Sequence, residues 1–171
     1  MSTTELDPTR IDIEFDPARQ RMNGIAQHGM TPFDVPFISQ IEGNLWQGGC
    51  RDGLILPTFF KHVVSLYKWE SYTVEHDLET AMTVKMFDSI GQGFEEIDDL
   101  AEWVNMCCDD GPTLVHCQAG LNRSSLVAGR ALTLRGWTPV QAIELLRQRR
   151  SPACLCNRAF EEWLLAKGGR P

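Results

Sequence analysis

One ten-residue stretch of the chain carries the residue types that phosphate chemistry requires. Residues 116–125 read His-Cys-Gln-Ala-Gly-Leu-Asn-Arg-Ser-Ser, so that Cys117 and Arg123 lie six positions apart, with Gly120 between them and Ser124 directly after the arginine. An arginine can donate two parallel hydrogen bonds to one anion, and a thiolate stabilised by the same positive field is a good nucleophile. The stretch therefore indicates attack by Cys117 on a phosphate ester.

The flanking residues predict a strand, a tight loop and a helix N-terminus around this stretch. Residues 113–115 form an apolar run, and apolar residues between 126 and 134 recur at helical spacing until Gly136. A loop in that position directs several backbone N–H groups and the positive end of a helix dipole at one point, which favours an anion. The predicted phosphate-binding residues are Gln118, Ala119, Gly120, Leu121, Asn122 and Arg123.

The pattern His116-Cys117-x5-Arg123-Ser124 resembles the signature loop of the protein tyrosine phosphatase superfamily, and Cys-Gln-Ala-Gly-x-x-Arg-Ser is most similar to its dual-specificity branch. The resemblance extends from about residue 37 to residue 165, through Leu-Trp-Gln-Gly-Gly at 45–49 and His-Val-Val-Ser-Leu at 62–66. It implies a thiophosphate intermediate on Cys117, with Arg123 and the loop amides holding the phosphate oxygens. Ser124 would assist departure of the sulfur, and His116 would order the loop.

The leaving oxygen needs a proton that the attacking cysteine cannot supply, so a general acid is expected. Asp88 follows a predicted strand at 81–87, in a loop with two glycines, and the resembling family places its acid at a comparable distance before the cysteine. We predict Asp88 as the acid and Asp77 as the second choice, with helix capping near Phe94 as the alternative role of Asp88. Asn157 either orients the hydrolytic water or caps the last helix.

The remaining elements predict an α/β fold. The expected elements are a hairpin at 37–47, a short helix at 56–60, a strand at 63–67, and helices at 94–104, 139–150 and after 157. Thr138 and Gln141 form a capping box, and the basic run at 147–150 suits the dipole of its helix without a ligand. Alternating strands and helices predict a single domain with a central, mostly parallel sheet flanked by helices, similar to dual-specificity phosphatases. Such sheets bind ligands at the carboxyl ends of their strands.

The chain divides into an N-terminal arm and a catalytic domain. Residues 1–35 are polar and interrupted by prolines, and we expect a loosely structured or docked arm in which the alternation of Ile11, Ile13 and Phe15 suits a short strand. Residues 36–167 form the predicted phosphatase domain. The whole chain has 171 residues, which is long enough to bury one hydrophobic core.

The composition of the chain indicates a cellular location and disfavours some classes of partner. The net charge of −7 disfavours bulk nucleic-acid binding and anionic membranes. No apolar window is long enough to span a membrane, and the N-terminus lacks the features of a signal peptide, which points to the cytoplasm. The six cysteines lack the spacing of a disulfide framework. We expect no cofactor and no metal, because Cys154-Leu155-Cys156 lacks further ligands and the acidic run at 95–102 suits a solvated helix face.

The expected substrate is a phosphorylated protein or peptide. No segment is available to build deep walls, so phosphoserine and phosphothreonine should be accepted beside phosphotyrosine, and the loop interior lacks the cations that an inositol phosphate calls for. Alternatives within the superfamily are an RNA 5′-phosphatase, suggested by Asn122 before Arg123, and a phosphoinositide phosphatase. A non-enzymatic pseudophosphatase, a rhodanese-type sulfurtransferase and a low-molecular-weight tyrosine phosphatase complete the alternatives. The sequence carries no signal for one oligomeric state over another.

Overall fold

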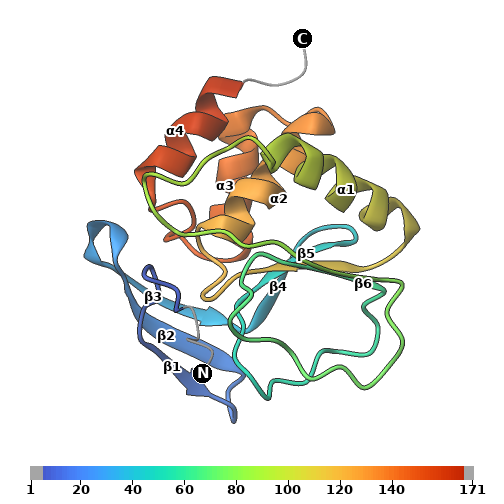
Figure 1. Cartoon of the computed structure of the whole chain (residues 1–171). Coiled ribbons are helices and arrows are strands. Elements are labelled where there is room, and N and C mark those ends of the chain that lie inside the picture. Colours follow the sequence, from blue (N-terminus) through green and yellow to red (C-terminus); the bar gives the residue numbers. More distant parts are fainter. Residues whose placement is uncertain (1–5, 168–171) are drawn as a thin grey trace, which may run out of the picture.

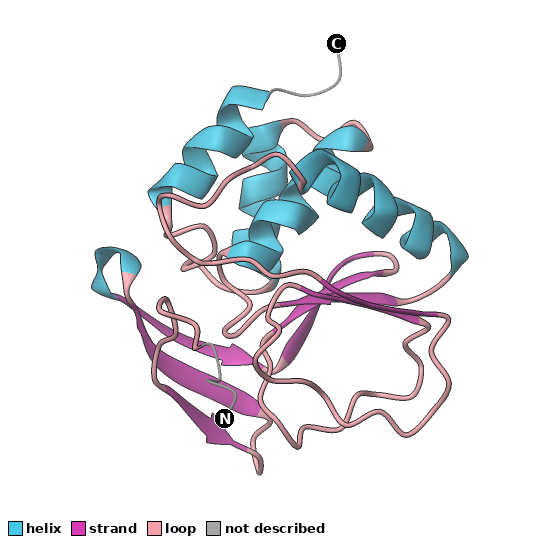
Figure 2. Ribbon diagram, viewed as in Figure 1, coloured by secondary structure: helices cyan, strands magenta, loops and turns pink. Residues whose placement is uncertain are grey.

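The computed structural model describes residues 6–167, which form two sheets and a layer of helices (Figures 1 and 2). The larger sheet has the strand order β4-β5-β8-β6-β7, in which only β4 and β5 pair antiparallel. Its strands are β4 (Ile38–Glu42), β5 (Leu45–Gly48), β6 (His62–Ser65), β7 (Thr80–Thr83) and β8 (Thr113–His116). The predicted central, mostly parallel sheet is confirmed.

The α-helices of the described residues lie on one side of this sheet (Figure 1). They are α1 (Ile97–Asp110), α2 (Arg123–Leu134), α3 (Pro139–Arg149) and α4 (Arg158–Lys167). Helix α2 contacts the other three, and it is buried on nearly all sides because it lies between them and the sheet. The predicted capping box of α3 is confirmed, since the Thr138 side chain accepts from the Gln141 N–H and the Gln141 side chain accepts from the Thr138 N–H.

The predicted hairpin is confirmed by the antiparallel pairing of β4 with β5, and Gly43 has a φ of 52° in the turn between them. The predicted helix at 56–60 is wrong. This segment makes a single turn, in which the Phe60 N–H donates to the Pro57 carbonyl. It cannot continue as a helix because Ile55 bridges Thr73 as extended backbone and Leu56 is buried in a small apolar cluster beside it.

A second, three-stranded antiparallel sheet precedes the larger one. It consists of β1 (Ile13–Asp16), β2 (Arg21–Ala26) and β3 (Thr31–Pro36), with the short 3-10 helix η1 (His28–Met30) between β2 and β3. β1 lies where the alternation of apolar residues predicted a strand, whereas β2 and β3 were not predicted. The prolines of β3 are compatible with a strand because β3 is at the sheet edge. Met22, Phe33 and Val35 dock this sheet onto the main core.

The two sheets and the helices share one large hydrophobic core, which extends from Met22 to Leu164. All six cysteines are free thiols. Within residues 6–167, no helix combines the length and the apolar character needed to cross a membrane.

Candidate phosphate-binding and catalytic site

The predicted phosphate-binding loop connects the carboxyl end of β8 to the N-terminus of α2, as the sequence indicated. Gly120 has a φ of 71°, which side-chain-bearing residues rarely adopt. A Cβ atom at this position would also lie 2.6 Å from the Gly48 carbonyl group and 2.7 Å from the Arg150 Nε atom. The loop therefore requires glycine here for both its backbone conformation and its close packing.

Cys117 and Ser124 face each other across this loop. The Cys117 sulfur is 3.3 Å from the Ser124 Oγ atom, and both residues are buried. Gln47 on β5 donates from its Nε2 atom to the Ser124 hydroxyl at 2.9 Å and to the Gly120 carbonyl at 2.9 Å. Gln47 Nε2 also lies 2.6 Å from the Ser125 hydroxyl, and the Ser124 hydroxyl is within hydrogen-bond distance of the sulfur, where a hydroxyl proton can stabilise negative charge.

Arg150 supports the loop from behind. Its guanidinium donates to the carbonyls of Gly120 at 2.7 Å, Ala119 at 2.9 Å and Pro36 at 2.9 Å, and to the Ser39 hydroxyl at 3.0 Å. Arg150 lies at the C-terminus of α3, where the sequence placed a basic run that suits the helix dipole, but it is buried and its guanidinium is bound by the loop, which the dipole alone does not explain. Its contacts hold the Ala119 and Gly120 carbonyls of the loop in place.

Arg123 lies beside Cys117 at the start of α2 and is only 3% exposed. Its Nη1 atom donates to the Asp7 carboxylate at 3.0 Å and to the Met86 carbonyl at 3.1 Å, and its guanidinium lies 5.1 Å from the centre of the Tyr67 ring. The Arg123 Nε atom is buried and has no hydrogen-bond partner. Part of the guanidinium therefore remains available to a further acceptor.

Asp88 lies in the same site, and three side chains donate to its carboxylate. Asn122 donates to Oδ2 at 3.0 Å, while Asn157 and His28 contact Oδ1 at 3.0 Å each. Burial alone would raise the pKa of Asp88, but the hydrogen bonds of His28 and Asn157 and the positive charges nearby outweigh it and lower the pKa below 3.8. Asp88 is therefore a carboxylate at neutral pH in this conformation.

His28 on η1 is the partner that sequence reasoning missed at Asp88. The hydrogen bond to Asp88 raises the pKa of His28 above its ordinary value of 6.5, although burial acts in the opposite direction. The His28 Nε2 atom is also 2.9 Å from the Asp88 carbonyl oxygen. The connection between β2 and β3 thus contributes a titratable group to the site of the larger sheet.

His116 lies directly before Cys117 and faces away from solvent. Burial lowers the pKa of His116 to about 4, so the imidazole is neutral. Its Nδ1 atom is 3.4 Å from the Cys117 carbonyl oxygen, and its ring meets Tyr72 edge-on at 5.1 Å. These contacts fit the predicted role of His116 in ordering the loop.

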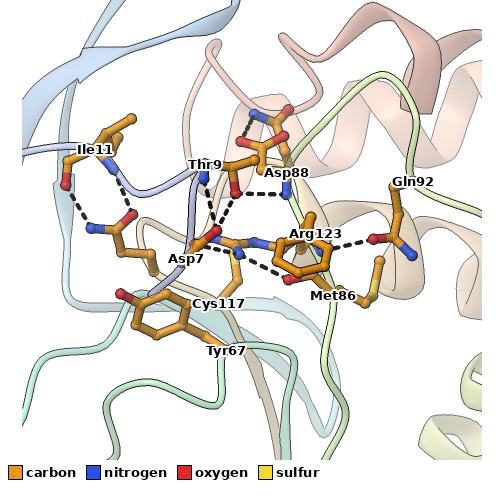
Figure 3. Close-up of polar contacts among 12 residues, drawn as sticks. Asp7, Thr9, Ile11, Tyr67, Met86, Asp88, Gln92, Cys117 and Arg123 are labelled. Atoms are coloured by element: carbon orange, nitrogen blue, oxygen red, sulfur yellow. Dashed lines mark hydrogen bonds and ion pairs between the residues drawn. The ribbon is translucent and has the colours of Figure 1, made fainter. Parts of the chain in front are cut away.

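The segment before β1 lies across the site (Figure 3). The Asp88 N–H donates to the Thr9 hydroxyl at 3.0 Å, and that hydroxyl donates to Asp7 Oδ1 at 2.6 Å. The Gln118 carboxamide pairs with the backbone of Ile11, accepting from its N–H at 3.0 Å and donating to its carbonyl at 2.6 Å. The cavity between this segment, Asp88 and the loop has a volume of only about 10 Å³.

The structure brings the predicted site residues together. Asp88, Cys117 and Arg123 line one small cavity with most of the loop, whereas Asp77 is exposed in the segment before β7. The alternative helix-capping role of Asp88 and the capping role of the Asn157 side chain are wrong, because the two side chains bind each other and the Asn157 Oδ1 atom has no partner. Asn157 does precede α4, and its carbonyl accepts from the Phe160 and Glu161 N–H groups.

Several contributors were missed, namely Asp7, His28, Gln47 and Arg150. For Arg150 a signal existed. It follows Ala142 and Leu146 at four-residue spacing, which places an arginine on the buried face of an amphipathic helix.

Among the described residues, one other cluster of possible metal ligands lies at the opposite end of the sheet. His62, Glu79 and Asp110 place one ligand atom each within 4.8 Å of one another. The Lys61 ammonium already pairs with Glu79 at 3.3 Å and with Asp110 at 3.2 Å. This cation supplies the positive charge that the carboxylates need, and the cluster is explained without an ion.

Comparisons with known proteins agree with this geometry. A family model described as "Dual specificity phosphatase, catalytic domain" matches residues 58–169, whereas a search of curated proteins returned no match. A mouse putative dual specificity phosphatase complexed with zinc tungstate superimposes with a TM-score of 0.65 at 18% identity, covering 77% of this chain and 88% of that one.

Two human structures are similar in fold. DUSP28 gives a TM-score of 0.65 at 16% identity, over 77% of this chain and 92% of that chain. The tyrosine phosphatase-like serine/threonine/tyrosine-interacting protein gives 0.62 at 16% identity, over 76% of this chain and 94% of that chain.

The family match covers most of the chain and decides against the sulfurtransferase and low-molecular-weight phosphatase alternatives. The match, the loop and the fold lead to one conclusion: the chain belongs to the dual-specificity branch of the protein tyrosine phosphatase superfamily and is a cysteine-based phosphatase.

Proposed function

We propose that this phosphatase hydrolyses phosphotyrosine, phosphoserine and phosphothreonine in proteins or peptides through a thiophosphate intermediate on Cys117. The observation that carries the proposal is the placement of the Cys117 sulfur 3.3 Å from the Ser124 hydroxyl, on the same loop as a buried Arg123 with an unpaired Nε–H. A nucleophile and an anion donor on one rigid loop are the requirement of phosphoryl transfer, in which positioning and charge stabilisation supply most of the catalysis.

The reaction has two steps. In the first, the Cys117 thiolate forms a bond to phosphorus, the phosphorus–oxygen ester bond breaks, and the leaving oxygen takes a proton from Asp88. In the second, water attacks phosphorus and gives a proton to the Asp88 carboxylate, the sulfur–phosphorus bond breaks, and inorganic phosphate leaves. Arg123 and the N–H groups of residues 118–123 hold the phosphoryl oxygens in both steps. Ser124 donates to the departing sulfur, and neither step needs a metal ion.

Asp88 must be protonated to act as the acid, yet its pKa is lowered in this conformation. His28 holds a proton against the Asp88 carboxylate, and Asn122 and Asn157 complete its hydrogen bonds. Movement of the proton from His28 to Asp88 within this pair gives the neutral acid that the first step requires. We therefore assign His28 a positioning role behind Asp88.

The short distance between the peptide backbone at Asp7 and the Arg123 guanidinium supports short phosphorylated side chains as substrates. Asp7 contacts Arg123 at 3.0 Å through a side chain with a single methylene group. A peptide backbone can therefore approach the loop closely enough for phosphoserine, and a deep slot that only a tyrosine ring spans is not required. Arg123 is the one cation among the described residues lining the cavity, which disfavours an inositol polyphosphate head group.

A turnover panel in the presence of a chelator tests the proposal. The panel contains phosphotyrosine, phosphoserine and phosphothreonine peptides, phosphoinositides and 5′-phosphorylated RNA. We expect hydrolysis of the phosphopeptides, inhibition by vanadate, and complete loss of turnover in Cys117→Ser. Faster turnover of the lipid or RNA than of any phosphopeptide would assign the enzyme to that substrate instead. Phosphate binding without any turnover would identify a pseudophosphatase.

The dependence of the hydrolysis rate on the leaving group tests the assignment of Asp88 as the general acid separately from the substrate. Asp88→Asn should slow hydrolysis of phenyl phosphate, a poor leaving group, by about 10²–10⁴-fold and affect 4-nitrophenyl phosphate much less. Asp77→Asn is the matched control, because Asp77 is exposed and does not line the cavity. If Asp77→Asn shows the leaving-group effect and Asp88→Asn does not, the acid is Asp77.

A further inference from the structure

The segment before β1 makes the contacts expected of a bound phosphopeptide. Asp7 is 5% exposed, its carboxylate pairs with Arg123 at 3.0 Å, and both side chains are withdrawn from solvent. A carboxylate is the natural stand-in for a phosphate, since both are anions that accept hydrogen bonds from guanidinium. Asp7 therefore occupies a donor that the phosphoryl group of a substrate would need.

The contacts continue along the backbone beyond Asp7. Four residues on, the Gln118 carboxamide pairs with both the N–H and the carbonyl of Ile11. The chain turns between Asp7 and Ile11, since the Arg10 N–H donates to the Asp7 carbonyl at 3.1 Å, and the contacts of Gln118 with backbone groups recognise the peptide irrespective of its side chains. Between the two anchors, Thr9 links Asp7 to the Asp88 backbone, which is the predicted general-acid loop (Figure 3).

The segment also fills the site. The remaining cavity has a volume of about 10 Å³, too little for a phosphoryl group, although its lining includes Asp88, Cys117 and Arg123. At the same time the buried Arg123 Nε–H has no acceptor. Asp7 thus satisfies Arg123 only in part, and a phosphate with three free oxygens has more acceptors to offer.

We propose that residues 7–11 are a pseudosubstrate that occupies the phosphopeptide site in cis, with Asp7 in place of the phosphorylated residue and Gln118 as the reader of the peptide backbone four residues after it. The proposal rests on the proposed function of the same site. Its consequence is that the enzyme alternates between a closed form and an open form. The true substrate is a peptide that turns directly after its phosphorylated residue, as residues 7–10 do, and that binds with the chain direction of residues 7–11.

Binding of inorganic phosphate, measured by calorimetry on the full-length chain, tests the blocking role without relying on turnover. Asp7→Asn removes the competing charge, and if the closed form holds nine-tenths of the molecules, the apparent Kd for phosphate should fall about tenfold. Asp12→Asn is the matched control, since it makes the same charge change on an exposed residue five positions further along. Thr9→Val, which removes the hydroxyl that holds Asp7 in place, should give an intermediate decrease.

The role of Gln118 is tested with synthetic peptides of residues 6–12 that carry phosphoserine in place of Asp7. One phosphoserine peptide has an ordinary backbone. The other is N-methylated at the position of Ile11, which removes the N–H that donates to the Gln118 Oε1 atom. With the Asp7→Asn enzyme, the N-methylated peptide should show a KM about 3–10-fold higher at an unchanged kcat, the loss expected for one hydrogen bond. With Gln118→Leu, the two peptides should become equivalent.

The outcomes separate the two proposals. Equal phosphate affinity in the wild type and in the Asp7 and Thr9 variants would overturn the pseudosubstrate, whatever the turnover. Equal KM values for the two peptides would overturn the reading by Gln118. Tighter phosphate binding in Asp7→Asn, together with no hydrolysis of any phosphate ester by any variant, would support the occupied site and refute the phosphopeptide chemistry.

Discussion

Substitution of Arg150 tests how far the phosphate-binding loop depends on the hydrogen bonds of this buried arginine. In Arg150→Met the loop loses the donors to Ala119 and Gly120, and Pro36 and Ser39 lose a partner on the other side. Gln47 still donates to the Gly120 carbonyl, and the Ser39 hydroxyl can rotate, so one or two buried carbonyls remain unsatisfied. Each unsatisfied carbonyl costs about 1–3 kcal/mol, and part of this cost is offset because the variant no longer buries a charged guanidinium. We therefore expect the free energy of unfolding of Arg150→Met to fall by about 2–3 kcal/mol.

This loss corresponds to a Tm lower by about 4–12 °C for a domain of this size, measurable by calorimetry or circular dichroism. The loop carbonyls also lose their fixed direction, and small displacements of phosphate-binding groups can cost about 10²-fold in rate. We expect a decrease of that order in kcat/KM for 4-nitrophenyl phosphate, assayed well below the Tm of the variant. Arg149→Met is the control, because Arg149 is the exposed neighbour on the same helix and should change stability by about 0.5 kcal/mol or less.

Two results would refute this reasoning. A variant that melts like the wild type would mean that the four hydrogen bonds contribute nothing net. A variant that melts early but retains its full kcat/KM would mean that Arg150 stabilises the fold without positioning the loop.

Three further changes have defined outcomes. In the wild type the proton of the acid is held by the His28–Asp88 pair, in which the pKa of His28 is raised; His28→Ala leaves this proton to the Asp88 carboxyl alone, so the basic limb of the kcat/KM profile should move to lower pH, and an unchanged limb would separate His28 from the acid. Gly120→Ala places an alanine at a φ of 71° and a Cβ atom 2.6 Å from the Gly48 carbonyl group, so denaturant unfolding should show a loss above about 2 kcal/mol. Arg123→Lys keeps the charge but not the planar pair of donors, and single-turnover assays should show most activity lost; near-normal rates would remove Arg123 from the mechanism.

The phosphate-binding loop was predictable from sequence because its signals are local. Cys117, Gly120 and Arg123 stand within seven residues, between an apolar strand and a helix, and the structure places them as those patterns indicate. The turn at 56–60 shows the limit of such patterns. Proline and two aromatic residues are compatible with a helix start, but the pairing of Ile55 with a segment further along the chain decided the local conformation.

The other contributors to the site depend on contacts that no local pattern encodes. His28 meets Asp88 across 60 positions, and Asp7 meets Arg123 across 116. A histidine in a polar segment and an aspartate before a proline carry no signal of burial by themselves. Their roles follow only from the docking of the smaller sheet, which depends on apolar residues such as Met22 and Phe33 that also look ordinary in sequence.

The separation of 116 positions between Asp7 and Arg123 has a consequence for how the molecule is made. During synthesis residues 7–11 leave the ribosome before the loop that they will cover, and their contacts with the site can form only once the strand, loop and helix that hold Arg123 are in place. Closing so long a chain segment adds little entropic cost over closing a shorter one, but contacts of high sequence separation form late in folding. The order of these contacts therefore implies an interval in which Arg123 is assembled and uncovered, before residues 7–11 reach it.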